Sequence, residues 1–268
     1  MQKSHFIAFI NTPQLWSGCL LSLEQFNLRE TDFNNFEISL IPEKLRLGHK
    51  VEYIFHQILN ACNQFNVLRH NLPIRNGKET LGELDYLVFD AKNQRKLHIE
   101  LTYKFYLIDT NHSNVFQQLI GPNKNDTFLA KAEKIQHKQF PLLKSPQTKE
   151  ALDKIGWKAN KVEQLVCFKA QVFIPYEAPK TNIHPLNNEC IAGKYVSYDG
   201  FIKSHFSAFK YYIPSKTDWL LPPNNTKDFI NHNTILPEVI KIIHKKKSPM
   251  LWMLRPNGNL EKLFVTYW

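Results

Sequence analysis

The fold is decided by residues 66–107, which read NVLRHNLPIRNGKETLGELDYLVFDAKNQRKLHIELTYKFYL. This stretch contains three runs that are typical of β-strands, over residues 66–75, 80–90 and 96–107. Asn76-Gly77 separates the first two runs, and this dipeptide is typical of a tight hairpin turn. A polar break separates the second run from the third. The stretch therefore predicts three consecutive antiparallel strands.

The third run has two distinct faces, because successive side chains of a strand point to opposite sides. One face is apolar and is expected to belong to the core; it carries Leu97, Ile99, Leu101, Tyr103, Phe105 and Leu107. The opposite face carries His98, Glu100, Thr102, Lys104 and Tyr106. In the second run, Glu83 and Asp85 share a face. Polar and charged side chains thus follow one face of each of the two strands.

Helices and a further strand flank these three runs. Apolar residues recur at steps of three and four from Leu47 to Ile58, and Pro42 suits a first helical turn, which together predict a helix over residues 43–61. Residues 124–140 have helical periodicity, and residues 164–175 are apolar and β-prone. The expected order is helix, three strands, helix and a further strand, within an α/β fold.

The remaining segments have weaker patterns. Residues 176–233 are expected to be mostly loops with short strands, residues 234–247 a short basic amphipathic helix, and residues 251–267 a hairpin. We predict three parts: a helical or irregular N-terminal lead-in over residues 1–40, a core over residues 41–175, and a C-terminal α+β extension over residues 176–268 that packs on the core.

The composition is that of a globular protein. Of 268 residues, 43% are hydrophobic and 13% aromatic, and only nine are glycine, which argues against a disordered or collagen-like chain. The four cysteines are scattered, without a CxxC pair, so neither a zinc site nor a disulfide framework is indicated. They are Cys19, Cys62, Cys167 and Cys190. We expect four free thiols and a cytoplasmic location.

The charge balance is basic. Lys and Arg number 34 against 24 Asp and Glu, which gives a formal net charge of +10. An excess of this size favours a polyanionic partner such as nucleic acid, although solubility alone explains it equally well. No stretch approaches the roughly 18 consecutive apolar residues of a membrane span, so we expect no membrane partner. The oligomeric state stays open.

Three carboxylates are expected to converge on the strands. Asp85 lies two residues after Glu83 on the second run, and Glu100 lies on the third. Neighbouring antiparallel strands lie about 5 Å apart, so these side chains can meet at one hard cation, for which Mg²⁺ is the natural choice and Mn²⁺ a substitute. Without a cation, like charges so close together destabilise the fold. A solvent-exposed strand face is the alternative interpretation.

These residues also carry a family resemblance. Gly82-Glu83-Leu84-Asp85, followed by Glu100 and Lys104, resembles the GExD and ExK pattern of the PD-(D/E)XK nuclease superfamily. More narrowly, the chain resembles an uncharacterised bacterial family, known as a domain of unknown function and placed in that superfamily by sequence. Further motifs carry this second resemblance; they are Arg46-Leu47-Gly48 with Glu52, Glu100 to Tyr106, and Gly121-Pro122-Asn123. The resemblance implies a restriction-endonuclease-like core.

The resemblance also implies roles for individual residues. Asp85 and Glu100 would bind the metal, Glu52 would support it from the first helix, and Lys104 would assist the attacking water. Arg46, Glu83 and Thr102 are supporting positions. The chain departs from the pattern at Thr102, where the usual lysine is expected two residues after the glutamate. Lys104 lies about 13 Å along the strand from Glu100 instead of about 7 Å.

Three explanations of this departure stay open: Lys104 reaches back, the strand carries a bulge, or a helix lysine such as Lys131 substitutes. Lys131, Lys134 and Lys138 fall on one side of the second expected helix, where they contact phosphate or simply face solvent.

The sequence contains none of the motifs of serine hydrolases, zinc proteases or nucleotide-binding loops. We expect a metal-dependent nuclease acting on nucleic acid, with DNA as the substrate. Two alternatives remain. The first is a catalytically degenerate nucleic-acid-binding or assembly module with the same fold, and the second is a structural protein without a nucleic-acid role.

Overall fold

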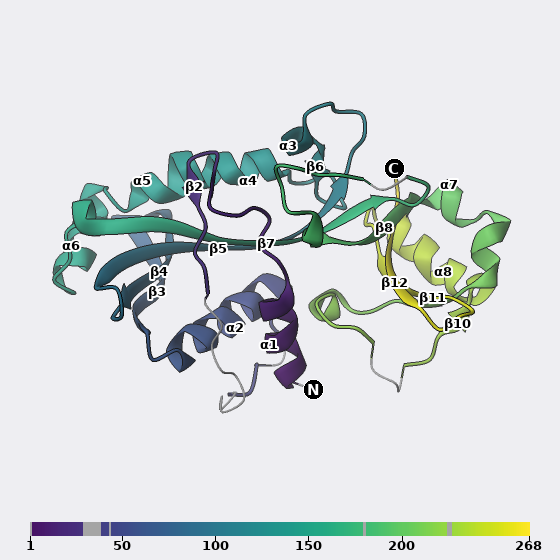
Figure 1. Ribbon diagram of the computed structural model, residues 1–268, viewed down its shortest axis with the longest axis horizontal. Helices are drawn as coiled ribbons and strands as arrows, with labels where there is room; N and C mark the ends of the chain where they lie inside the picture. Colours follow the sequence, from purple (N-terminus) through teal and green to yellow (C-terminus); the bar gives the residue numbers. More distant parts are fainter. Residues whose placement is uncertain (1, 29–38, 43, 179–180, 224–226) are drawn as a thin grey trace.

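The structure of the protein is a computed structural model that describes residues 2–28, 39–42, 44–178, 181–223 and 227–268. It is a mixed α/β fold built on one large sheet of both parallel and antiparallel strands (Figure 1). In order across the sheet, the strands are β10 (Ile230–Asn231), β9 (Lys210–Tyr212), β11 (Met250–Leu254), β12 (Leu260–Thr266), β8 (Ile191–Ser197), β7 (Val162–Pro175), β5 (Arg95–Ile108), β4 (Glu79–Asp90) and β3 (Phe65–Asn76). A further strand, β6 (Leu119–Ile120), pairs with the end of β5.

The three strands predicted from residues 66–107 are confirmed as the antiparallel set β3, β4 and β5. The turn between β3 and β4 contains Gly77, whose positive φ of 60° is the conformation that glycine adopts without strain. The predicted strand at residues 164–175 is β7, which pairs with β5 in parallel from Lys96 to Leu107. A parallel neighbour requires a long crossover connection, and the helices between β5 and β7 provide it.

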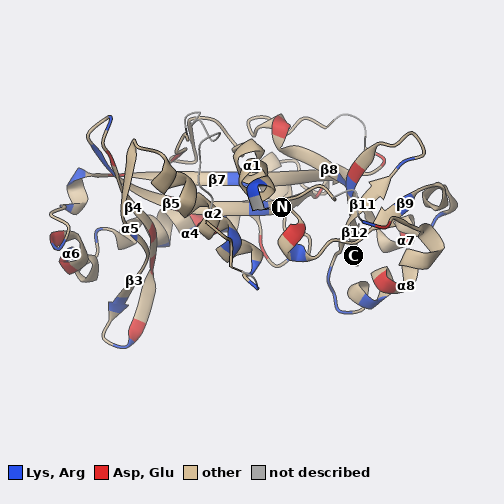
Figure 2. Cartoon of the chain, turned by 90° about the horizontal axis from the view of Figure 1, so that it is seen from below, with Lys and Arg blue, Asp and Glu red and all other residues tan. Residues whose placement is uncertain are grey.

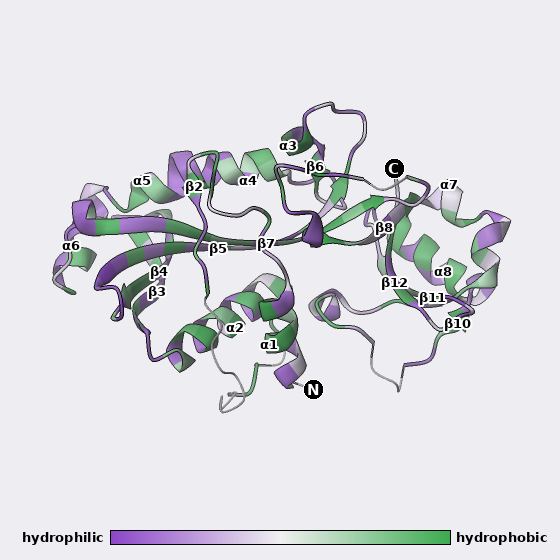
Figure 3. Ribbon diagram, in the orientation of Figure 1, coloured by the Kyte–Doolittle hydropathy of each residue, from purple (hydrophilic) through white to green (hydrophobic). Residues whose placement is uncertain are grey.

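Helices cover both faces of the sheet at β5 and β7. On one face, α1 (Gln2–Asn11) and α2 (Leu47–Ala61) pack against the apolar side of β5. Figure 3 shows polar and apolar residues alternating along α2, as expected for an amphipathic helix. On the other face lies a helical segment made of α4 (Phe128–Lys134), a π-helical turn (Ile135–Gln139) and α5 (Phe140–Leu142), followed by α6 (Pro146–Asp153). The polar face of β5 is therefore buried as well.

The two helices predicted on either side of the three strands begin later than expected. The helix predicted from residue 43 begins at Leu47, because Arg46 before it is extended, with φ −63° and ψ 152°. Pro42 therefore precedes the helix, and residue 43 lies outside the described residues. The helix predicted from residue 124 begins at Phe128, where the Thr127 hydroxyl caps it by accepting a hydrogen bond from the backbone N–H of Ala130.

The C-terminal part extends the same sheet. β8 pairs in parallel with the end of β7, β12 pairs in parallel with β8, and β11 and β12 form the predicted hairpin. The helix predicted over residues 234–247 is α8 (His232–Ile243), which packs with α7 (Tyr198–Phe201) near β11 and β12. Among the described residues, no helix has the length and apolar character that crossing a membrane requires.

The N-terminal residues belong to the core, although their sequence carried little signal. Phe6 and Phe9 of α1 are buried beside α2. After α1, the chain runs along the part of the β7 edge that β8 leaves free, where the N–H groups of Leu15 and Phe26 donate to the carbonyls of Phe168 and Val166. The short strands β1 (Cys19–Leu20) and β2 (Leu23–Glu24) pair there, and a small helix, α3 (Val115–Gln118), precedes β6. All four cysteines are free thiols.

Asp90 fixes the turn between β4 and β5 and thereby the register of the two strands. Its side chain is fully buried and accepts hydrogen bonds from Gln64 at 3.0 Å, Asn93 at 2.7 Å and Arg95 at 3.1 Å. Burial alone would raise the pKa of Asp90, but these hydrogen bonds outweigh it and lower the pKa to about 2.

We predict that Asp90→Asn lowers the free energy of unfolding by about 2 kcal/mol at neutral pH. A lowered carboxyl pKa in the folded state stabilises the protein above the unfolded pKa, and this contribution disappears as the pH falls toward 2. Urea unfolding of the variant and the parent should therefore differ at pH 7 and converge between pH 4 and pH 2. A difference that stays constant with pH would contradict this account.

Candidate functional site

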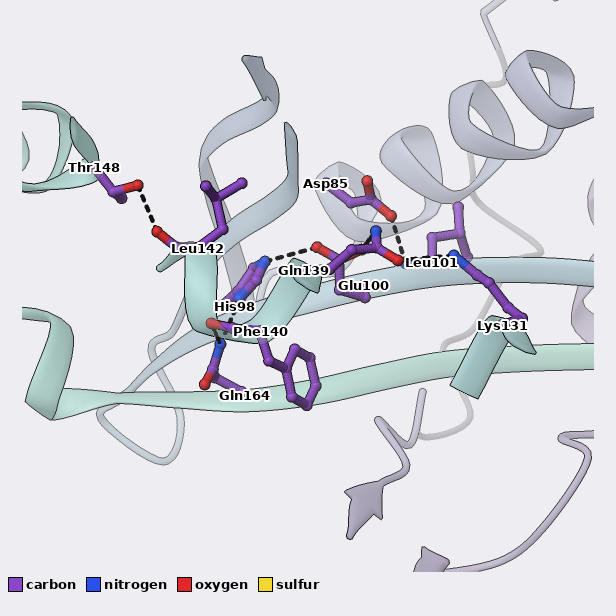
Figure 4. A network of polar contacts seen from close by, with 10 residues as sticks. All are labelled: Asp85, His98, Glu100, Leu101, Lys131, Gln139, Phe140, Leu142, Thr148 and Gln164. Atoms are coloured by element: carbon purple, nitrogen blue, oxygen red, sulfur yellow. Dashed lines mark hydrogen bonds and ion pairs between the residues drawn. The ribbon is translucent and has the colours of Figure 1, made fainter. Parts of the chain in front are cut away.

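Strands β4 and β5 separate beside Asp85. Their pairing ends at Tyr86 opposite Ile99, so Asp85 is the first residue of β4 beyond the paired region. One oxygen of the Asp85 carboxylate accepts a hydrogen bond of 2.8 Å from the backbone N–H of Leu101, which has no partner on β4. The register brings Asp85 beside Glu100, and the two carboxyl groups lie close together (Figure 4). Asp85 and Glu100 therefore converge as predicted, whereas Glu83, the third carboxylate expected there, is exposed.

Glu100 is fully buried and is held by two side chains. One oxygen accepts from Nε2 of His98 at 2.9 Å, and the other accepts from the amide of Gln139 in the π-helical turn. The Gln164 amide donates both to the carbonyl of Phe140, at 2.7 Å, and to Nδ1 of His98, at 3.1 Å. Nδ1 is therefore an acceptor, so the proton of the neutral ring is on Nε2 and points at Glu100. Burial lowers the pKa of His98 to about 4, which keeps the ring neutral.

Burial makes ionisation of both carboxyl groups less favourable. Burial, together with the charge of Glu100, raises the pKa of Asp85 to about 8. Burial raises the pKa of Glu100 to about 7, although Lys131 and hydrogen bonds from Asp85 favour its ionised form. Two acidic groups that share one buried space ionise separately rather than together. Positive charge nearby would stabilise the ionised carboxylates, and the neutral His98 ring does not provide it.

Lys131 supplies positive charge from the opposite side. It lies on α4, and its Nζ donates to Oε1 of Gln139 at 3.0 Å, while the amide nitrogen of Gln139 binds Glu100 (Figure 4). Burial lowers the pKa of Lys131, and the charges of Glu100 and Asp85 oppose that shift. Lys131, Gln139 and Glu100 thus form one connected set.

The π-helical turn explains why Gln139, rather than Lys138, completes this set. A π turn accommodates one more residue than an α turn, so the residues after it are displaced by one position around the helix. Lys138 is exposed and does not line the site. Lys134 is also exposed, but it lines the cleft and lowers the pKa of Glu100. Of the three lysines in the predicted stripe, the structure therefore brings two to the site.

A cleft of about 420 Å³ opens beside these residues. Glu52, Thr102, Lys104, Lys131 and Lys134 are among its lining residues. The Lys104 ammonium does not point at Glu100; it forms a 2.5 Å ion pair with Asp126, which lies before α4. The hydroxyl of Thr102 is buried and has no hydrogen-bond partner among the described residues. Three basic side chains and a threonine with an unsatisfied hydroxyl thus line the cleft near the buried acidic pair.

Glu52, predicted as a third metal ligand, and Glu83 do not gather with the acidic pair as metal ligands among the described residues. The Glu52 carboxylate lines the cleft but lies 3.1 Å from Nδ1 of His49 and 3.4 Å from the amide of Asn71. Glu83 is exposed on β4; burial and the charge of Glu52 raise its pKa. Arg46 is exposed at the start of α2 and is not a lining residue of the cleft.

The acidic pair offers two carboxyl groups as possible ligands of a metal ion. Within the described ranges, no three His, Cys, Asp or Glu side chains gather as metal ligands. Mg²⁺ is, however, commonly bound through one or two carboxylates, with water and substrate phosphates completing its shell. Asp85 and Glu100 provide two carboxyl groups of this kind.

Four residues of the site were not identified from the sequence: His98, Gln164 and Gln139 around Glu100, and Asp126 beside Lys104. His98 lies two residues before Glu100 on the same strand, so its position on the polar face was the one signal that could have indicated it. The other three come from segments whose position depends on the packing of the helices after β5.

The chain belongs to the family described as Domain of unknown function (DUF1853), which it matches over residues 11–265. The match includes β3 to β7, the acidic pair and the C-terminal strands of the sheet. No curated protein and no solved structure matches the chain.

Proposed function

We propose that this chain is a metal-dependent nuclease of the PD-(D/E)XK type, which hydrolyses phosphodiester bonds in nucleic acid, with DNA as the expected substrate. The observation that carries the proposal is the meeting of Asp85 and Glu100 where two antiparallel strands separate, with Lys131 against them. The order of elements supports it, because α2, the strands β3 to β5, α4 and β7 follow the order that such a core would have.

In this proposal, Asp85 and Glu100 hold Mg²⁺, which when bound lowers the pKa of a water and neutralises charge on the phosphoryl oxygens. Lys131 provides fixed positive charge toward the scissile phosphate, so that the charge developing during hydrolysis is stabilised without reorganisation. Gln139 and His98 keep Glu100 in one orientation by donating to both of its oxygens. Lys104 and Lys134 contact the phosphates on either side.

The position of Lys131 supports activity over loss of activity. Thr102 occupies the position of the usual lysine, which favours the alternative of a binding module that has lost turnover. Lys131 of α4 binds Gln139, which binds Glu100, and its charge acts on the acidic pair, whereas Lys104 is engaged with Asp126. Of the three explanations for the departure at Thr102, the substitution by a helix lysine therefore agrees best with these contacts.

The direct test is cleavage of single- and double-stranded DNA and RNA by the purified protein with Mg²⁺ or Mn²⁺, and with EDTA as the control. We expect metal-dependent cleavage of DNA that Glu100→Gln abolishes. Binding without cleavage in any metal would support the degenerate module instead. If neither binding nor cleavage is found, the protein has a structural role.

We also predict that nucleic-acid affinity falls steeply with salt. Positive charge is spread over many elements rather than gathered on one (Figure 2). Each phosphate contact releases counterions, so the logarithm of the association constant should fall by about 0.9 per contact for each tenfold rise in salt. Fluorescence anisotropy of a labelled duplex, measured at salt concentrations from about 50 to about 300 mM, gives this slope. Affinity that does not change with salt would exclude phosphate contacts as the basis of binding.

A further inference from the structure

A second cavity, of about 470 Å³, lies away from the acidic pair. It is formed between α1, the edges of β7 and β8, the segment at Leu220, and β12. Most of its lining is apolar and includes Ile7, Ala8, Pro13 and Leu220. This size lies within the range of small-molecule sites in proteins, which combine an apolar lining with a few placed polar groups.

Lys262 of β12 is the charged group of this cavity. The residue is only 8% exposed, and its Nζ donates to Oε1 of Gln171 at 2.6 Å and to the carbonyl of Trp219 at 3.1 Å. It also lies over the ring of Trp252, 5.3 Å from the ring centre. None of the carboxylates in the described part of the chain forms an ion pair with it. Burial lowers the pKa of Lys262 to about 8, so the ammonium is still largely protonated at neutral pH.

In the hydrogen bonds that lead away from Lys262, each group donates to the next, and none of these groups is negatively charged. Because an ammonium only donates, Gln171 accepts through its oxygen and donates through its nitrogen to the hydroxyl of Tyr103, at 2.8 Å. The Tyr103 hydroxyl lies 2.7 Å from that of Thr12, which donates to the carbonyl of Ala8. The chain of donors therefore ends on a backbone carbonyl. The charge of Lys262 is solvated by dipoles alone, and an ammonium has a third N–H to donate.

We propose that this cavity binds a small organic monocarboxylate, whose carboxylate pairs with Lys262 and whose apolar body lies against Ile7, Pro13 and Leu220. A buried cation without a counter-ion is stabilised by an anion that enters the cavity. One lysine matches one negative charge, and the exposed carboxylate of Glu189 at the cavity disfavours a second. This selects a monocarboxylate over inorganic phosphate or a nucleotide.

The test is isothermal titration calorimetry of the full chain with acetate, butyrate, hexanoate and inorganic phosphate. We expect hexanoate to bind more tightly than acetate, and phosphate to show no binding. Lys262→Met should weaken hexanoate binding by about 10- to 100-fold, the loss expected for a hydrogen bond to a buried charge. Lys194→Met is the matched control, because Lys194 also donates to a carbonyl, that of Tyr176, and lies over an aromatic ring, but does not line the cavity.

A second variant tests the cavity without depending on whether Lys262→Met folds. Ala192→Phe adds a ring at an exposed position of the cavity wall and leaves Lys262 in place. It should abolish hexanoate binding while the thermal unfolding curve stays near that of the parent. Hexanoate should also protect Lys262, but not Lys194, from acetylation by acetic anhydride, as measured by peptide mass spectrometry. Binding that is unchanged in Ala192→Phe, phosphate binding as tight as that of hexanoate, or no binding of any carboxylate would each overturn the proposal.

Discussion

Asp85→Ala is expected to remove both divalent-metal binding and nucleic-acid cleavage, with a loss in turnover of about 10³-fold or more. Asp85 is one of the two carboxyl groups of the pair, and without it Glu100 is the one remaining acidic side chain at this position. One carboxylate holds Mg²⁺ more weakly than two, so the charge on the phosphate would be neutralised far less. Calorimetric titration with Mn²⁺ and single-turnover cleavage measure the two losses separately.

Glu83→Ala is the matched control for this experiment. Glu83 lies on the same strand two residues earlier, but its side chain is exposed, whereas Asp85 is half-buried beside Glu100. Its removal should leave metal affinity unchanged and turnover within a few-fold of the parent. If Asp85→Ala cleaves as well as Glu83→Ala, the acidic pair is not the catalytic centre, and the proposed nuclease function is wrong.

Lys131→Met should lower turnover by about 10²-fold while the affinity for Mn²⁺ stays nearly intact. The reason is that Lys131 provides charge beside the acidic pair without being a metal ligand. Methionine keeps the length and the packing of the side chain, so the loss reports the charge. Measuring kcat at saturating metal separates this effect from weaker metal binding.

Two further lysines make the experiment specific. Lys138→Met changes a residue on the same helical segment that is exposed outside the cleft, so turnover should not change. Lys104→Met removes the ion pair with Asp126 and should have a smaller effect than Lys131→Met. If Lys104→Met loses 10²-fold and Lys131→Met does not, Lys104 rather than Lys131 acts on the scissile phosphate, and the role assigned to Lys131 is wrong.

The strands could be predicted because their signals are local. Asn76-Gly77 forces a tight turn, and the alternation along residues 96–107 assigns each side chain to a face whatever packs against it. Together they place Asp85 and Glu100 on the same face of neighbouring strands. This is why the acidic pair was predictable from residues 66–107 alone.

The rest of the site depends on contacts between distant segments. The lysine stripe was predicted with ordinary helical spacing, but the π turn at Ile135–Gln139 displaces Lys138 and brings Gln139 to Glu100. A pattern of hydrophobic residues does not reveal such a turn. Likewise, Lys104 pairs with Asp126 because residues 121–126 fold back beside β5, which no motif indicates.

The parallel pairing of β5 with β7 has a consequence for the order of folding. The hairpins β3–β4 and β4–β5 join neighbouring segments of the chain. In contrast, β7 pairs with β5 across the whole helical crossover that connects them. Local contacts form faster than distant ones, so we expect Asp85 and Glu100 to meet early, while water still solvates their charges. The two acids then lose their water only when α4 and β7 dock on the strands. The free-energy cost of burying their charges is therefore part of the last folding barrier before the native state.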